Sequence, residues 1–342
     1  MDKKPLVIPV FIPHSGCPHH CAFCNQAIIT NQKARLPDKE GLDQIVNQYL
    51  HYKGKREPVE LAFFGGNFLG QSCENIRHLL DLAQPYIHAN KIDAIRFSTR
   101  PDTITAKSLD MIRSCNISTI ELGVQSMTDE VLLTSKRGHT SMDTINAIRL
   151  LKDYSFRIGV QVMVGLPGDN EELLFESTKK VAQLAPDFAR IYPLMVLKGS
   201  LMEHWYYQGK YQPLSLEKSI RLVKKMVHIF RTANVTVVRM GLQASDMMED
   251  KSMVLAGPWH PAFGHLVFSE ILYDSACSKI DQYRDLSVTR RMVLCVHPKS
   301  ESRLRGNKNM NLKKLDLQYP ELVFSIRLDE TIPVNQVVLS EG

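Results

Sequence analysis

The sequence predicts an α/β fold, a partial (β/α)6 barrel of the TIM type followed by a C-terminal α+β extension. Six apolar segments of strand length alternate with longer segments of helical periodicity, and this repeated strand-helix order is typical of a parallel sheet. Several strands are apolar on both faces, as expected when helices cover one side and a filled barrel interior covers the other. The 342 residues are enough for such a barrel with an extension.

The predicted elements follow one another in regular order. Strands are expected at residues 7–12, 59–64, 92–97, 118–124, 157–164 and 188–194, and helices near residues 40–51, 70–86, 103–114, 128–152 and 170–184. Asp102-Thr103 and Asp169-Asn170 supply helix N-caps. A long amphipathic helix near residues 215–233 and a possible further strand at 235–240 complete this part. We therefore expect a barrel domain over residues 1–240 and an extension over 241–342.

The composition is that of a folded, water-soluble protein. Hydrophobic residues make up 44% and charged residues 23% of the chain, both ordinary values. No run reaches the roughly 18 to 20 apolar residues of a membrane span, and Met1 to Pro5 lead into a strand, not into a signal peptide. The seven cysteines, an odd number, fit poorly with a disulfide framework. The sequence thus predicts a cytoplasmic protein without a membrane partner.

The net charge of +6 is mild and does not by itself establish an anionic partner. Its distribution is more informative, because residues 299–314 hold six Lys or Arg against one Glu, and Arg290 and Arg291 lie just upstream. This stretch is either a solvated basic surface or a surface that binds RNA or phosphate. Residues 254–264 (VLAGPWHPAFG) are either a packed turn or a lid over the barrel mouth.

Three cysteines crowd into residues 16–26 (GCPHHCAFCNQ): Cys17, Cys21 and Cys24. Thiolates select zinc or iron-sulfur clusters, and a four-iron cluster usually takes four protein sulfurs. Three cysteines would therefore leave one iron open to a substrate or cofactor. The alternatives are three packing cysteines and a structural zinc site. The zinc site could recruit one of three histidines as its fourth ligand (His14, His19 or His20), but the sequence has no second C-x-x-C pair.

The spacing C-x-x-x-C-x-x-C, with Phe23 just before the last cysteine, resembles the signature of the radical S-adenosylmethionine (SAM) superfamily. The resemblance implies that Cys17, Cys21 and Cys24 hold a 4Fe-4S cluster whose fourth iron is chelated by the amino and carboxylate groups of SAM. It also implies an external one-electron donor of the flavodoxin or ferredoxin type. The reduced cluster of this superfamily cleaves SAM to a 5′-deoxyadenosyl radical, which abstracts hydrogen from the substrate.

The resemblance also implies SAM contacts at the carboxyl ends of the first strands, where barrel enzymes place their chemistry. Gly65, Gly66 and Asn67 in FGGNF are similar to the family's Gly-Gly segment, where glycine lets the backbone approach the SAM amino group. Ser98 follows the third strand and Gln125 follows the fourth. Both are expected to hydrogen-bond polar atoms of SAM.

Four further residues take SAM-binding roles by the same resemblance, which here is to oxygen-independent coproporphyrinogen dehydrogenases. Arg137 would pair with the SAM carboxylate, and Gln161 would face the ribose. Val164 and Gly165 would line the adenine. Surface or capping roles are the alternatives for Ser98, Arg137 and Gln161.

Over roughly residues 7–245 the motifs FFGGNF, FSTRPD, ELGVQS, KRGHT and VGLPGD resemble the radical SAM core of the Elongator catalytic subunit and its stand-alone bacterial relatives. That subunit modifies the wobble uridine of tRNA with the help of an acetyltransferase domain. The hundred or so residues after the core are too few for such a domain. On this resemblance and the basic stretch at residues 299–314, we expect an RNA base, in tRNA, as the substrate. A small anionic metabolite or a tetrapyrrole-like substrate is the alternative, and a non-catalytic, zinc-stabilised RNA-binding module is the alternative from another class.

Overall fold

The computed structural model describes residues 5–12, 17, 20–25, 36–242, 253–284 and 291–341. His14, Gly16, Pro18, His19, Gln26 and Arg290 lie outside the described residues. The chain forms two compact units. The barrel unit comprises Met1–Ser215 and Met226–Trp259, and the C-terminal unit comprises Leu216–Lys225 and His260–Gly342.

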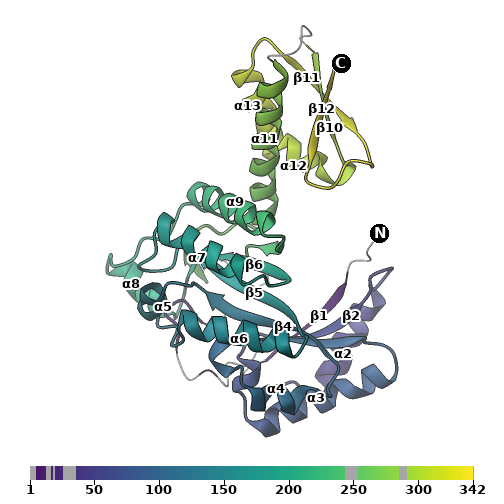
Figure 1. Cartoon of the computed structure of the whole chain (residues 1–342), viewed down its shortest axis with the longest axis vertical. Coiled ribbons are helices and arrows are strands. Elements are labelled where there is room, and N and C mark those ends of the chain that lie inside the picture. The colour runs from purple at the N-terminus through teal and green to yellow at the C-terminus, as the bar shows by residue number, and fades with distance from the viewer. Residues whose placement is uncertain are drawn as a thin grey trace. The chain divides into compact units, whose positions relative to one another are not determined.

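A curled sheet of seven parallel strands forms the centre of the barrel unit (Figure 1). Its order is β1-β2-β3-β4-β5-β6-β8, and every neighbouring pair is parallel. The strands are β1 (Leu6–Phe11), β2 (Val59–Phe64), β3 (Ala94–Thr99), β4 (Ile117–Gln125), β5 (Arg157–Val164), β6 (Phe188–Pro193) and β8 (Thr236–Met240). The predicted partial parallel barrel is confirmed, and the segment considered a possible further strand is its seventh strand, β8.

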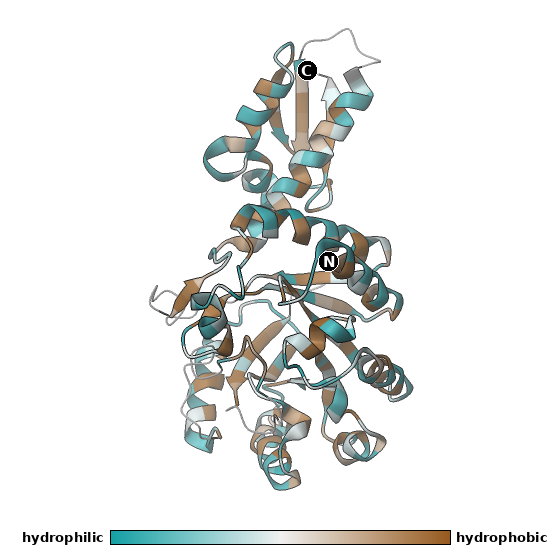
Figure 2. Ribbon diagram, turned by 90° about the vertical axis from the view of Figure 1, so that its left-hand side faces the viewer, coloured by the Kyte–Doolittle hydropathy of each residue, from teal (hydrophilic) through white to brown (hydrophobic). Residues whose placement is uncertain are grey.

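Helices connect successive strands and pack hydrophobic residues against the sheet (Figure 2). They are α2 (Lys39–His51), α3 (Cys73–His88), α4 (Ala106–Ile112), α5 (Asp129–Thr134), α6 (Ser141–Asp153), α7 (Glu171–Gln183), α8 (Leu201–Tyr207) and α9 (Leu216–Thr232). Side chains of Asp38, Ser72, Thr105, Thr140 and Asn170 accept hydrogen bonds from the first turns of α2, α3, α4, α6 and α7. Short 3-10 helices at Phe68–Gly70 and Pro101–Thr103 follow β2 and β3.

The prediction of one helix over residues 128–152 is wrong. The chain leaves the helix after α5 because Lys136 and Gly138 take positive φ values of 53° and 74°. It starts again at α6, where Thr140 and Asp143 form a reciprocal capping box. Residues 134–141 (TSKRGHTS) contain no apolar residue, so Gly138 and the Thr140 cap were usable signals of this break in the sequence.

The C-terminal unit packs helices on one face of a mixed three-stranded sheet. Strand β10 (Arg291–Val296) runs parallel to β11 (Val323–Leu328) and antiparallel to β12 (Val337–Glu341). Helix α11 (Phe263–Arg284) precedes the sheet, and α12 (Glu301–Arg305) and α13 (Met310–Gln318) connect β10 to β11. The core of this unit includes Leu272, Ala276, Ile280, Met292, Leu294, Leu304 and Leu315.

Two features of this part of the chain differ from the sequence expectation. The sequence pattern of the extension predicts a helix near residues 265–276, and α11 extends beyond it at both ends. A small ribbon in the barrel unit, β7 (Val196–Leu197) with β9 (Val254–Ala256), was not predicted. No helix within the described ranges has both the length and the apolar character needed to cross a bilayer.

We predict that Gly159→Ala destabilises the barrel unit by about 1–3 kcal/mol, the usual cost of overpacking a core. A Cβ at Gly159 on β5 would lie 2.3 Å from Cζ of Phe188 and 3.0 Å from Cγ of Glu121. Urea unfolding followed by circular dichroism measures the change. Gly41→Ala is the matched control, because its added methyl group meets only the Asp38 carboxylate at 3.2 Å. Equal stability of the two variants would contradict the prediction.

Candidate functional site

The carboxyl ends of the strands open into a cavity of about 330 Å³. The structure brings most of the predicted site residues to its wall: Cys17, Cys21, Phe23, Cys24, Gly65, Gly66, Asn67, Ser98, Gln125, Arg137 and Gln161. Two predicted residues are not in this lining. Val164 is fully buried, and Gly165 accepts a hydrogen bond at its carbonyl from the Tyr211 hydroxyl at 2.6 Å.

The cysteine loop is held by backbone contacts to distant parts of the barrel unit. The Ala22 amide donates to the Ser135 carbonyl at 2.9 Å, and the Ala22 carbonyl accepts from the Met202 amide at 3.0 Å. The Asn25 side chain donates to the Lys198 carbonyl at 2.7 Å. These bonds fix the loop from the chain after α5 and from the start of α8, so the fold itself positions the cysteines.

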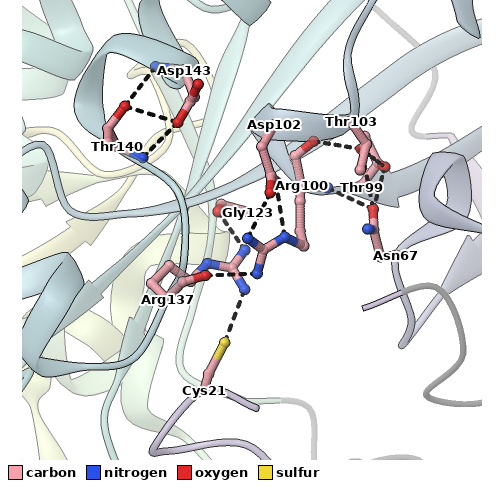
Figure 3. A network of polar contacts seen from close by, with 10 residues as sticks. All are labelled: Cys21, Asn67, Thr99, Arg100, Asp102, Thr103, Gly123, Arg137, Thr140 and Asp143. Carbon is pink, nitrogen blue, oxygen red and sulfur yellow. Dashed lines mark hydrogen bonds and ion pairs between the residues drawn. The ribbon is translucent and has the colours of Figure 1, made fainter. Parts of the chain in front are cut away.

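Arg137 lies directly between the cysteine loop and β4 (Figure 3). Its Nη1 donates to Cys21 Sγ at 3.3 Å, and its Nη2 donates to the Gly123 carbonyl at 2.6 Å. A Cβ at Gly123 would lie 2.6 Å from that Nη2, so only glycine leaves space for the guanidinium. The break between α5 and α6 is what brings Arg137 to this position.

A second buried guanidinium, that of Arg100, lies beside Arg137 (Figure 3). Arg100 makes a two-point contact with Asp102 at 2.9 and 2.8 Å, and its Nη1 donates to the Arg137 carbonyl at 2.7 Å. Its amide donates to Asn67 Oδ1 at 3.0 Å, and the same oxygen accepts from Thr99 and Thr103. The Asn67 side chain therefore organises the end of β3, and this contact supports the two arginines.

These positive charges act on the titratable groups around them. Burial raises the pKa of the Cys17 thiol, and the charges of Arg137 and Arg100 oppose that effect. Burial, together with the charges of the same two arginines, lowers the pKa of His139 to about 3. His139 is therefore neutral at physiological pH, and the two guanidinium groups are the positive charges of this wall.

Gln125 ends β4 with a backbone suited to a binding residue. Its φ is 69°, in the left-handed region, and the β4-β5 pairing shifts register between Gly123 and Gln125. Its buried Oε1 has no hydrogen-bond partner among the described residues, and the same holds for Nε of Arg137. Unsatisfied buried polar atoms in a cavity wall indicate that a polar ligand completes the site.

The opposite wall of the cavity is built on a buried carboxylate, Glu121. Burial alone would raise the pKa of Glu121, but the charges of Arg190 and Arg96 lower it below its ordinary value. The ion-pair distances are 2.7 Å to Arg190 Nε and 2.5 Å to Arg96 Nη2. Gln161 Nε2 donates to Glu121 Oε2 at 3.2 Å and to Ser98 Oγ at 3.1 Å. Ser98 and Gln161, predicted separately, thus belong to one network.

Sequence reasoning missed several residues of the cavity wall: Phe11, Phe64, Met163, Arg190, Met195, Leu197, Arg239 and Leu242. Arg100 and Glu121 lie in polar segments at strand ends, and that position was a usable signal. Leu242 and the β7 residue Leu197 had no signal, because long-range folding brings them to the cavity. Trp259 packs against Met195 and Leu197, which is the packing role considered for residues 254–264.

Comparison with known families agrees with this geometry. Residues 11–180 match the model of the radical SAM superfamily, and residues 186–272 match the radical SAM C-terminal domain. The chain belongs to the radical SAM superfamily. Proteins of this superfamily use a 4Fe-4S cluster and SAM and need an electron donor.

Relatives of this radical SAM protein include proteins that modify tRNA. It is 28% identical over 305 residues to the tRNA uridine(34) acetyltransferase of Methanocaldococcus jannaschii, over 73% of this chain and 56% of the relative. An uncharacterized M. jannaschii protein is 30% identical over 234 residues, with 65% and 70% coverage. Human Elongator complex protein 3 is 25% identical over 191 residues, with 50% and 35% coverage. The chain thus spans little more than half the length of the M. jannaschii acetyltransferase.

Solved structures agree on the fold. Elp3 of Methanocaldococcus infernus, with an N-terminal deletion, superposes with a TM-score of 0.64 at 23% identity, over 79% of this chain and 63% of that one. HydG, a maturase of the [FeFe]-hydrogenase, superposes with a TM-score of 0.54 at 14% identity, over 78% and 55% of the two chains.

The lining of the cavity suits the cofactors of the superfamily. The described residues contain no group of three His, Cys, Asp or Glu side chains that could hold a metal ion. A four-iron cluster has a different requirement, because each cysteine binds a separate iron at a separate corner. Three cysteines share one cavity with two buried guanidiniums that offset anionic charge, and the unsatisfied Gln125 oxygen accepts donors of a polar ligand. The residues therefore fit a cluster and SAM.

We predict that the apoprotein loses stability as pH falls from 6.5 toward 3 because of His139. Its pKa is about 3 in the folded chain against 6.5 in the unfolded one, so the unfolded state takes up the proton first. The loss should be about 1.4 kcal/mol per pH unit within that window, and the contribution is fully present above it. Urea unfolding at several pH values, compared with His139→Gln, measures this slope. Parallel pH profiles of the two proteins would refute the assignment.

Proposed function

We propose that this protein is a radical SAM enzyme that acts on a base of RNA. Cys17, Cys21 and Cys24 hold the cluster, which when bound supplies the electron for reductive cleavage of SAM. The observation that carries the proposal is the convergence of these cysteines and the predicted SAM residues of β2 to β5 on one cavity. The 4Fe-4S cluster is reduced by an external donor of the flavodoxin or ferredoxin type, and the protein works in the cytoplasm.

The chain's own residues divide the cavity into two regions in this proposal. Near the cysteines, Arg137 and Arg100 offset the negative charge of cluster and SAM carboxylate. Gly65 and Gly66 admit the SAM amino group, since no side chain stands between the backbone and the cavity. Phe23 covers the cluster, and Gln125 binds polar atoms of SAM.

The wall formed by β4, β5 and β6 faces the reacting part of the substrate. Gln161 donates to Glu121 and to Ser98, and in this proposal Gln161 faces the ribose of SAM while Ser98 hydrogen-bonds polar atoms of SAM. Tyr192 and Arg190 lie farther along the same wall. A polar wall on a rigid sheet positions a planar, hydrogen-bonding group, which suits a nucleobase. Val164 and Gly165, which the sequence resemblance assigned to the adenine, lie outside the lining of this cavity.

An RNA substrate is supported by the relatives, of which several are named tRNA uridine(34) acetyltransferases. A small anionic substrate is the second candidate, and it is favoured by Arg190 and Arg239 in the cavity wall.

We predict that Cys21→Ala abolishes both the cluster and SAM cleavage, because a thiolate ligand is lost. Anaerobically purified wild-type protein should be brown, carry about four irons per chain, and release 5′-deoxyadenosine from SAM with dithionite. Cys73→Ala is the matched control, since Cys73 is exposed on α3. A colourless wild-type protein with one zinc per chain, or a Cys21→Ala variant that keeps its iron, would overturn the proposal.

We also predict that tRNA binds the full chain with an affinity that falls steeply as salt rises. Each phosphate contact contributes a slope of about −0.7 to −0.9 in a plot of log affinity against log salt concentration. A gel-shift titration at several salt concentrations measures it. Binding that is insensitive to salt would count against an RNA substrate and in favour of the small anionic one.

A further inference from the structure

The C-terminal unit contains a loop with a rigid backbone, Gly306–Asn309, between α12 and α13. Gly306 has a φ of 71°, and a Cβ there would lie 2.8 Å from Cγ of Asn311. Asn311 is 2% exposed, and its Nδ2 donates to the carbonyls of Ser269 at 3.0 Å and Arg303 at 3.3 Å. The Asn309 amide donates to the Gly306 carbonyl at 3.2 Å. A buried amide side chain therefore holds the loop from below.

The side chains of the same loop are not used by the fold. Asn307, Lys308, Asn309 and Met310 are all exposed. Lys308 and Asn309 have φ values of 51° and 58°, a conformation that asparagine tolerates and that costs energy for lysine. A lysine kept on a rigid loop in an unfavourable backbone conformation indicates a role outside the fold.

The basic residues around this loop fall into two groups. Arg305 pairs with Glu301 at 2.8 Å, Lys314 pairs with Glu270 at 3.0 Å, and the Arg303 guanidinium lies 4.8 Å above the Phe268 ring. These three cations are occupied within the unit. Lys299, Lys308 and Lys313 are exposed, and none forms an ion pair with a described residue.

We propose that this surface, defined by Lys299, the Gly306–Asn309 loop and Lys313, binds the phosphate backbone of single-stranded RNA. Strand β10, two short helices joined by the loop, and the parallel strand β11 form a β-α-α-β unit. KH domains use a G-x-x-G loop to clamp four nucleotides of a single strand. Here the loop is Gly-Asn-Lys-Asn, with Asn309 at the fourth position.

Single-stranded RNA suits this surface better than other anionic partners for two physical reasons. The loop contributes the charge of Lys308, and the exposed Lys299 and Lys313 on either side of it in the chain add two more cations for a repeating phosphate chain. Within the described sheet, β11 pairs only with β10 and is therefore an edge strand. In the part of the chain that the structure describes, the other edge of β11, the strand that follows α13, is open. The inference that the bound strand is a substrate rests on the proposed function, but the binding itself does not.

The test uses the full chain and a fluorescent oligouridylate of roughly a dozen nucleotides, with fluorescence anisotropy as the readout. The variant K299Q/K308N/K313Q removes three charges, and asparagine at position 308 favours the existing backbone conformation. Three lost contacts should make the slope of log affinity against log salt less negative by about 2 and weaken binding about tenfold or more at 0.1 M salt.

Two matched variants control for charge and chemistry. K299R/K308R/K313R keeps the cations and should bind as the wild type does. K107Q/K152Q/K179Q removes three exposed lysines from α4, α6 and α7 of the barrel unit and should also leave binding unchanged. SAM cleavage to 5′-deoxyadenosine without RNA should be equal in all four proteins. That activity separates a failure of this proposal from a failure of the proposed function.

Three results would overturn the proposal. The first is an unchanged salt slope in K299Q/K308N/K313Q. The second is an equal loss of affinity in K107Q/K152Q/K179Q, which would mean that general positive charge binds the RNA. The third is binding of the protein to vesicles of phosphatidylserine and phosphatidylcholine without binding to the oligonucleotide, which would identify a lipid headgroup site.

Discussion

The structure of the candidate site depends on the place taken by one buried guanidinium, that of Arg137. It reaches Cys21 Sγ with one nitrogen and the Gly123 carbonyl with another, so it joins the cysteine loop to the end of β4. A buried charge must be hydrogen-bonded. This requirement explains why residue 123 is a glycine, why the chain breaks between α5 and α6, and why Arg100 donates to the Arg137 carbonyl. The neighbouring His139 stays neutral because burial first, and then these same charges, lower its pKa.

The cavity is bordered by two different electrostatic environments. On the cysteine side, the two guanidiniums provide positive charge where anionic sulfur and carboxylate groups would bind. On the far side, Glu121 is enclosed by Arg96 and Arg190, so charge is balanced and the polar groups of Ser98 and Gln161 are held in place. Preorganised polar groups in a buried site interact more strongly with a ligand than they would in water.

The two compact units suit separate tasks in the proposed function. The barrel unit places every described cavity residue on a rigid parallel sheet or on a loop fixed to it. The C-terminal unit has its own core and carries outward lysines that its fold does not use. An enzyme for a polymer needs both parts, because chemistry requires a closed site whereas affinity for a long anion requires an exposed surface.

By itself the sequence determined the strand order, the parallel sheet and the cysteine cluster. These features are local. Hydrophobic periodicity along the chain indicates each helix and strand, and three cysteines within eight residues are visible in the sequence without any tertiary contact. It also placed Ser98 and Gln125 at strand ends, where parallel strands of a barrel converge, and the family resemblance added Arg137 and Gln161.

Only the tertiary structure decided which of these residues meet and what supports them. The bond of Arg137 to Cys21 joins positions 116 residues apart, and the network around Glu121 joins four strands. Such features follow from burial and hydrogen bonding between distant segments, and periodicity along the chain carries no information about them.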